Sequence, residues 1–146
     1  MNSIAINGEL LEKLEEHAMR AYPEECCGIL FKEAENTEES VIAEAAELTN
    51  RDSREISGRH FHIGPLELYQ YEKAYREKGF EICGFYHSHP DKRALPSTED
   101  EKEMLPGMVY LIISARKEDC PEISAWRKEN LDGKVKEIIL EGNMKK

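Results

Sequence analysis

One stretch near the middle of the chain joins an apolar run to two closely spaced histidines. Residues 80–86 are mostly apolar and are typical of a buried β-strand, and His87 and His89 follow directly at its end. Because side chains two positions apart in a strand point to the same face of the sheet, these two imidazoles can bind one metal ion. We therefore expect the chain to fold around a buried strand that carries a pair of metal ligands.

The residues after this pair supply a carboxylate. A proline-bounded loop leads to residues 97–101, which have the composition of the first turn of a helix with Ser97 or Thr98 as its N-cap. Asp100 lies in that turn. Two histidines and one carboxylate leave one position of a tetrahedral zinc ion open for water, which is the pattern of catalytic zinc sites. The stretch thus predicts a hydrolytic metal site.

Length and hydropathy favour one globular domain. The 146 residues suffice for one domain with a hydrophobic core and are few for two, so we expect a single domain over residues 1–146. No apolar run approaches the ~18 residues of a membrane span, and we expect no contact with a membrane. The first residues lack the basic and apolar regions of a signal peptide. We expect a cytoplasmic location.

Charge and cysteine content argue against two further classes of protein. The formal net charge of −10 disfavours nucleic acid binding, which requires a basic surface. Cys26 and Cys27 are adjacent while Cys83 and Cys120 stand alone, so we expect reduced thiols and no disulfide framework. A redox role for the adjacent pair is less favoured than packing at the start of a buried strand.

Hydrophobic spacing predicts the elements of the N-terminal part. A strand at residues 4–6 precedes a helix at residues 8–21, which Pro23 ends, and residues 26–31 form a buried strand. Residues 41–48 are expected to return as a strand, although their alanines and glutamates suit a helix almost equally well.

The central part continues with a polar loop at residues 49–58 and a strand at residues 59–63. A helix at residues 66–78 follows and ends at Gly79. The side chains of this helix that are expected to face the sheet are Leu66, Tyr69, Ala74 and Tyr75.

The C-terminal part is expected to be β-structure. A strand at residues 108–115 precedes a hairpin of residues 123–128 and 134–140, which surrounds a turn-rich connection. Strands interspersed with two long helices and followed by an antiparallel hairpin indicate an α/β or α+β sandwich.

A hydrolytic metal site also needs a group that moves protons, and a carboxylate is the usual choice. Glutamates are so common here that composition cannot select one. Glu25 is singled out by its context, because it is flanked by Pro23 and a buried strand, where burial could raise its pKa.

These positions together resemble a known signature. His87-Ser88-His89-Pro90, six residues, Ser97, two residues and Asp100, preceded by Glu25 in Pro-Glu-Glu-Cys-Cys-Gly, is similar to the motif of the JAMM (MPN-plus) zinc metalloproteases. The resemblance spans most of the chain and is greatest to small bacterial and archaeal members. It implies a curved mixed β-sheet flanked by helices, the cytidine-deaminase-like sandwich of MPN domains.

The resemblance also implies roles for individual residues. His87, His89 and Asp100 would bind one zinc ion per chain. Glu25 would act as general base and acid, since the family's spacing of a glutamate two residues before the Cys-Gly pair selects it over Glu24. Ser97 would donate a hydrogen bond to the oxyanion.

The resemblance further implies a substrate class. Relatives that cut ubiquitin chains carry insertions, one of them with a second zinc, for which this chain has no room. What remains resembles proteases that act on ubiquitin-like sulfur-carrier proteins. Such a carrier, cut after its C-terminal Gly-Gly tail by a peptidase or isopeptidase, is the expected partner.

Several alternatives stay open. His60 and His62 form a second pair on one strand, but no carboxylate follows at matching spacing, so a structural or substrate-groove role is expected. Ser88 points away from the two histidines, and its role is undecided. A non-catalytic MPN scaffold would lack the ligand set. A zinc hydrolase or deaminase for a small amide or nucleobase would need a Cys-x-x-Cys pair that is absent.

Overall fold

In this computed structural model, residues 3–35, 41–48, 64–116 and 122–143 are described. They form an eight-stranded mixed sheet in the order β3-β1-β8-β7-β6-β5-β2-β4. The strands are β1 Ser3–Asn7, β2 Cys27–Glu33, β3 Val41–Ile42, β4 Glu44–Leu48, β5 Phe80–Pro90, β6 Val109–Ala115, β7 Glu122–Lys128 and β8 Val135–Asn143. The helices are α1 Gly8–Ala21, α3 Pro65–Arg76 and α4 Thr98–Glu103.

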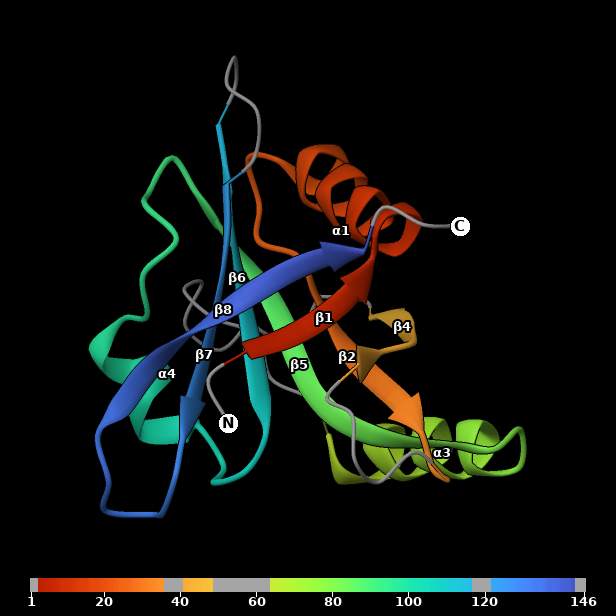
Figure 1. The fold of residues 1–146 in the computed structure, drawn as a ribbon. Coiled ribbons are helices and arrows are strands. Elements are labelled where there is room, and N and C mark those ends of the chain that lie inside the picture. Colours follow the sequence, from red (N-terminus) through yellow and green to blue (C-terminus); the bar gives the residue numbers. More distant parts are fainter. Residues whose placement is uncertain (1–2, 36–40, 49–63, 117–121, 144–146) are drawn as a thin grey trace.

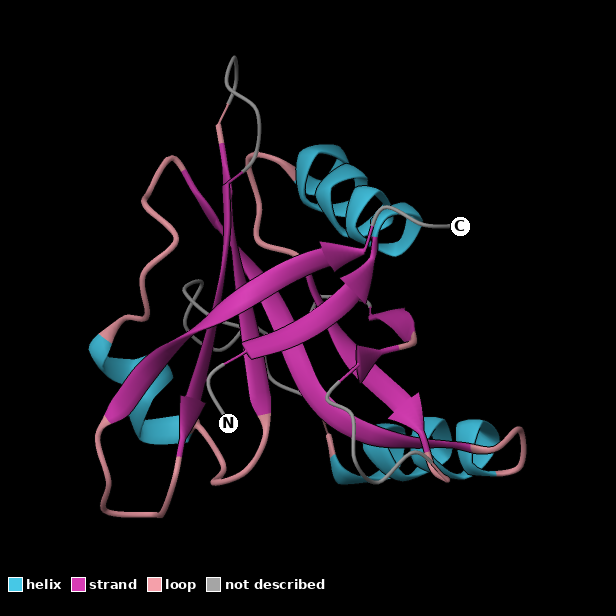
Figure 2. Ribbon diagram, viewed as in Figure 1, coloured by secondary structure: helices cyan, strands magenta, loops and turns pink. Residues whose placement is uncertain are grey.

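The sheet is mixed and strongly curved (Figure 1). β5 and β6 run parallel, as does β1 with β3 and β8, whereas the other neighbouring strands are antiparallel. The helices lie around the sheet rather than between its strands (Figure 2). This arrangement confirms the expected curved mixed sheet with flanking helices. The elements predicted for residues 41–48 and for the C-terminal hairpin are strands, as expected.

Helix α1 has the predicted bounds and covers one face of the sheet. It begins after Asn7, whose side chain accepts hydrogen bonds from the backbone N–H groups of Glu9 and Leu10. Leu14 and Ala18 lie on one side of the helix and are buried against apolar residues of β1, β6 and β8. The local sequence thus fixes both the start of α1 and the face that it buries.

Helix α3 packs on the opposite face, and of the four residues predicted to face the sheet only Tyr75 does so. Leu66 and Tyr69 are 70% and 53% exposed, and Ala74 is exposed as well. The partly buried apolar residues are Leu68, Tyr71 and Tyr75. Tyr75 stacks on Phe31 of β2 with ring centroids 3.8 Å apart. The predicted and observed stripes share Tyr75, and each contains one further tyrosine, so apolar spacing within the helix does not select between them.

Strand β5 lies between β2 and β6 and is longer than the predicted strand, because it includes both histidines. Gly28 and Gly84 let neighbouring groups approach closely. A Cβ atom on Gly28 would lie 2.1 Å from the ring of Tyr86, and one on Gly84 would lie 2.0 Å from the carbonyl oxygen of Val109. The absence of side chains at these positions allows β2, β5 and β6 to pack at their observed spacing.

The loop predicted at residues 49–58 and the strand predicted at residues 59–63 lie outside the described residues. Within the described ranges, no helix combines the length and apolar character needed to cross a membrane.

Candidate metal centre

Two histidine side chains lie next to each other at the end of β5. His87 and His89 are buried, and their Nε2 atoms are 3.2 Å apart. Strand alternation places both rings on the α3 side of the sheet, together with Phe85. The structure therefore brings this pair together as the spacing predicted.

Asp100 of α4 completes the group. Its Oδ2 atom lies 3.3 Å from Nε2 of His87 and 3.1 Å from Nε2 of His89. Neighbouring ligand atoms around a tetrahedral zinc ion are about 3.3 Å apart when each bond is about 2.0–2.1 Å long. The three atoms thus form a triangle of the size that zinc requires, and the donor set of two imidazoles and one carboxylate suits this metal.

The start of α4 holds the carboxylate of Asp100. Ser97 is the N-cap residue, and Thr98 is the first residue of the helix. The Asp100 amide donates to Ser97 Oγ over 3.0 Å, and the Ser97 amide donates to Asp100 Oδ2 over 2.8 Å. Burial opposes a charge on Asp100, but hydrogen bonds from His87 and His89 hold the pKa of its carboxyl well below the ordinary value.

A backbone carbonyl orients the second histidine. Nδ1 of His89 lies 3.3 Å from the carbonyl oxygen of Arg93. Because a carbonyl can only accept, Nδ1 carries the hydrogen in the neutral form of the ring, and Nε2 then has a lone pair for a metal. Burial lowers the pKa of His89, but the hydrogen bond and charge of Asp100 outweigh it and raise the pKa above 6.5.

Glu25 reaches the same site from the start of β2. Cys27, two residues later, lies in register opposite His87, so the entrance to β2 adjoins the end of β5. The side chain of Glu25 is half-buried, whereas Glu24 is exposed. The pairing of β2 with β5 thus brings together two segments that are about 60 residues apart in the sequence.

The surroundings of Glu25 favour its protonated form. Burial raises the pKa of its carboxyl to about 7. The negative charge of Asp100 also raises this pKa, whereas His89 and Lys92 lower it. A carboxyl with a pKa near neutrality is suited to accept and return a proton.

Ser88 lies between the two histidines in sequence, but its side chain points to the other face of the sheet. It is fully buried, and its Oγ accepts a hydrogen bond from the Cys26 amide over 2.8 Å. The Ser88 amide in turn donates to the Cys26 carbonyl over 3.0 Å. These two bonds hold the residue that follows Glu25, so Ser88 stabilises the backbone beside the site.

The adjacent cysteines are packing residues. Cys26 and Cys27 are buried and form no disulfide. Burial raises the pKa of the Cys26 thiol to about 11, and it also raises that of Cys27. Little reactive thiolate is expected at such values near neutral pH. Cys83 is also a free thiol, and Cys120 lies outside the described residues.

Sequence reasoning missed a buried histidine behind the site. Nδ1 of His17 on α1 lies 2.8 Å from the hydroxyl oxygen of Tyr86 on β5. Burial lowers the pKa of His17, although nearby Glu47 opposes this shift. Tyr86 faces α1 whereas His87 and His89 face α3, so the pair of His17 and Tyr86 stabilises β5 from the side opposite to the site. His17 lies three residues after Leu14, in the apolar stripe of α1, and this spacing could have indicated that its side chain is buried.

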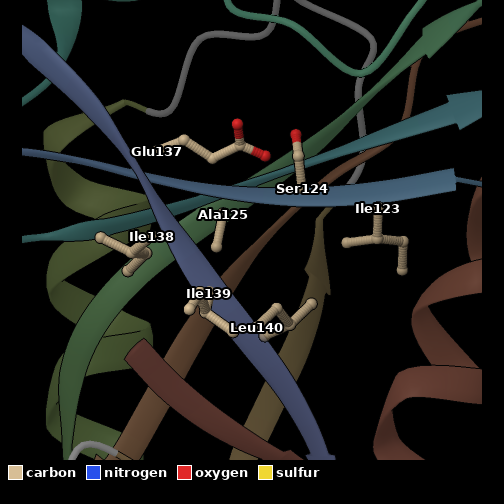
Figure 3. A pocket seen from close by; sticks show the side chains of 7 residues that line it. All are labelled: Ile123, Ser124, Ala125, Glu137, Ile138, Ile139 and Leu140. Carbon is tan, nitrogen blue, oxygen red and sulfur yellow. The ribbon is translucent and has the colours of Figure 1, made fainter. Parts of the chain in front are cut away.

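A pocket between β7 and β8 lies apart from the cluster of His87, His89 and Asp100. A hollow of about 320 Å³ lies between β7 and β8, where the two strands separate beyond the pair Ala125 and Ile138 (Figure 3). His87, His89 and Asp100 are not among the residues that line it. The predicted second histidine pair, His60 and His62, lies outside the described residues.

Comparison with known proteins identifies related sequences. A family model described as prokaryotic homologs of the JAB domain matches residues 8–129. Desampylase from Haloferax volcanii is 31% identical over 106 residues, which cover 72% of this chain and 73% of that protein. A probable TtuB-protein conjugate cleaving protease from Thermus thermophilus is 30% identical over 103 residues, which cover 70% of this chain and 64% of that protein.

Solved structures share the fold. A protein from Desulfitobacterium hafniense superposes with a TM-score of 0.81 at 29% identity, over 97% of this chain and 94% of that chain. A JAB1/MPN domain protein from Archaeoglobus fulgidus superposes with a TM-score of 0.55 at 21% identity, over 94% of this chain and 97% of that chain. The expected MPN-type fold is therefore confirmed.

Proposed function

Because the chain belongs to the family of prokaryotic homologs of the JAB domain, we propose that it is a zinc-dependent isopeptidase for conjugates of a ubiquitin-like protein. The observation that carries this proposal is the triangle of ligand atoms, with edges of 3.1–3.3 Å, beside a glutamate whose pKa is about 7. The printed names of the two curated relatives, a desampylase and a conjugate cleaving protease, support the reaction class.

His87, His89 and Asp100 would hold the zinc ion. When bound, zinc would act as a Lewis acid toward an amide carbonyl and make a water molecule more acidic. Hydrogen bonds that support this role orient two of these side chains, since the Arg93 carbonyl orients His89 and the N-cap of α4 orients Asp100. Little reorganisation would then be needed for binding.

Glu25 would move the proton. As a carboxylate it would take a proton from the attacking water, and as a carboxylic acid it would give that proton to the leaving amine. Both forms are accessible near neutral pH, because burial raises the pKa of Glu25 to about 7.

Ser97 would donate a hydrogen bond to the oxyanion. Its Oγ accepts a hydrogen bond from the Asp100 amide, which uses a lone pair of that oxygen. The hydroxyl hydrogen is not consumed by this bond and could point toward substrate. Ser97 would thus combine a structural role at the helix start with a role in catalysis.

The proposed substrate segment is an extended C-terminal tail ending in Gly-Gly, as in a ubiquitin-like sulfur-carrier protein. Such tails commonly bind by adding a strand to exposed backbone. Because β5 is flanked by β2 and β6, we place this segment along the loop between His89 and Ser97. Glycines beside the scissile bond would allow the backbone to approach the ligand cluster closely.

The ligand cluster also weighs against the alternatives. A non-catalytic scaffold would have no use for three converging donor atoms and an adjacent carboxyl with a raised pKa. A zinc deaminase would use cysteine ligands, and within the described residues the converging group contains none.

A cleavage assay tests the proposal. The zinc-loaded protein is incubated with ubiquitin-like sulfur carriers joined through Gly-Gly to a short peptide or to a lysine side chain, and products are identified by mass spectrometry. We expect cleavage after the second glycine, abolished by a chelator and by Glu25→Gln. Cleavage that persists without metal, or an unchanged kcat/KM when bulkier residues replace Gly-Gly, would contradict the proposal.

A further inference from the structure

The helix that carries Asp100 has little packing of its own. α4 is six residues long and none of its residues is buried. Helices of this length are not stable in isolation, so the orientation of α4 must come from contacts with the rest of the protein. The position of a metal ligand on such a helix depends on those contacts.

Lys128 at the end of β7 makes one of them. Its Nζ donates to the carbonyl oxygen of Glu101 over 2.7 Å, although Lys128 is only 7% exposed. The Glu101 carbonyl is among the last four of the helix, which have no partner within it. A cation here also interacts favourably with the C-terminal end of the helix dipole. In Figure 1, α4 lies beside the end of β7.

Ser124 on the same strand makes a second contact. Its hydroxyl donates to the carbonyl oxygen of Ala94 over 2.5 Å, and it accepts from Nε1 of Trp126 over 2.6 Å. Ala94 is buried in the loop that precedes α4. In Figure 3, Ser124 projects from β7 to the opposite side from Ala125. Because the Ser124 oxygen accepts a hydrogen bond from Trp126, the hydroxyl hydrogen of Ser124 is directed toward the Ala94 carbonyl.

The two carbonyl groups held in this way bracket the metal-binding turn. Ala94 lies three residues before Ser97, and Glu101 directly follows Asp100. β7 is also close to the histidines in the sheet, because Ser124 lies in register with Ile112 of β6, which lies in register with His87. One strand thus holds the segment bearing Asp100 over the strand that carries the two imidazoles.

We propose that Ser124 and Lys128 are positioning residues that hold the turn from Ser97 to Asp100 over His87 and His89 and thereby set the affinity of the site for metal. This inference rests on the proposed ligand assignment. Neither side chain touches the ligand atoms, so both act through the backbone of Ala94 and Glu101. Removal of such outer contacts typically weakens metal binding by about 10- to 100-fold.

The test measures metal binding without substrate. The Zn²⁺ dissociation constant is determined by competition with a chromophoric chelator, and the coordination geometry by the visible absorption of the Co²⁺ form. We expect Lys128→Met and Ser124→Ala each to weaken Zn²⁺ binding by about 10-fold or more and to change the Co²⁺ spectrum. Ser124→Thr, which keeps the hydroxyl, should restore most of the affinity. Lys136→Met, at an exposed position on β8, is the matched control and should bind Zn²⁺ as the parent protein does.

A double-mutant cycle separates positioning from general stability. In an Asp100→Ala background, Lys128→Met and Ser124→Ala should cause no further loss of Zn²⁺ affinity, because the ligand that they position is gone. Equal losses in both backgrounds, or an unchanged affinity in a folded Lys128→Met protein, would overturn the inference. If Lys128→Met does not fold, Ser124→Ala carries the same test. If Asp100→Ala alone leaves Zn²⁺ binding intact, the ligand assignment fails instead.

Discussion

Ser97 and Asp100 hold each other through two reciprocal hydrogen bonds. The Asp100 amide donates to Ser97 Oγ over 3.0 Å, while the Ser97 amide donates to Asp100 Oδ2 over 2.8 Å. That same Oδ2 atom lies 3.1 Å from Nε2 of His89. The interaction that starts the helix therefore also aims the carboxylate at the histidines.

The first prediction separates the two roles of Ser97. Ser97→Ala removes the N-cap acceptor and should lower the free energy of unfolding by about 1 kcal/mol. It also removes the proposed oxyanion donor, so turnover should fall on the order of 10²-fold or more. Ser97→Thr keeps both functions of the hydroxyl and should restore most of each. Chemical denaturation and kcat are measured on both variants.

A result in which Ser97→Ala lost stability but kept full turnover would assign Ser97 a structural role only. Ser97 would then not be the oxyanion donor, but it would still be the N-cap residue of α4.

The second prediction concerns the ligands. Alanine at His87, His89 or Asp100 should remove most of the metal, because each supplies one of three converging atoms. Elemental analysis should give one zinc per chain for the parent protein.

The control for the ligands is a double alanine substitution at His60 and His62, which should leave the zinc bound. Two metals per chain, or loss of zinc in that double variant alone, would show that the ligands have been assigned to the wrong histidines.

Local sequence was sufficient for much of the fold. The bounds of α1 were predictable because its apolar stripe and the following Pro23 are local signals. The meeting of His87 with His89 was predictable because it follows from strand alternation alone. The N-cap at Ser97 was one of two adjacent candidates, and the reciprocal bonds with Asp100 select it.

Contacts between distant segments could not be predicted. The bond from Lys128 to the Glu101 carbonyl and that from Ser124 to Ala94 exist only because β7 lies next to β6, and spacing within the sequence does not encode that order. For the same reason, three of the four residues predicted to face the sheet from α3 were wrong, and only Tyr75 was right. Which side of the helix is buried depends on the apolar residues that distant strands present to it.

The third prediction tests the close packing of β5 on β6. In Gly84→Ala, the new Cβ would lie 2.0 Å from the carbonyl oxygen of Val109, so the strands must move apart. We expect a loss of about 1–3 kcal/mol in the free energy of unfolding. Gly142→Ala is the control, because its Cβ would meet Leu11 at an ordinary 3.8 Å. Equal effects in the two variants would contradict the packing argument.

The fourth prediction concerns pH. In the metal-free protein, burial raises the pKa of Glu25 to about 7, and the bond to Asp100 raises that of His89 above 6.5 despite burial. A raised pKa contributes stability that is present at low pH and is lost as the pH rises through the folded-state value. The Tm of the metal-free protein should therefore fall as the pH rises from about 4.5, the ordinary pKa of a glutamate, to about 7, the pKa of Glu25 in the folded protein.

Zinc binding should show the opposite trend, because a proton on His89 competes with the metal. The increase in Tm on adding zinc should be larger at pH 8 than at pH 6. Calorimetry at both values, with and without zinc, tests this prediction, and a larger increase at pH 6 would refute the proposed competition.

The last prediction concerns Glu25. Glutamine keeps the shape of the side chain but cannot accept the proton, so Glu25→Gln should fold, bind zinc with the parent stoichiometry and lose about 10²–10⁴-fold in kcat with little change in substrate affinity. Glu24→Gln is the matched control one residue away, and it should retain activity because Glu24 is exposed while Glu25 is half-buried next to the ligands. If Glu24→Gln abolished turnover and Glu25→Gln did not, the carboxyl with the raised pKa would not be the base, and burial beside His89 and Asp100 would need another explanation.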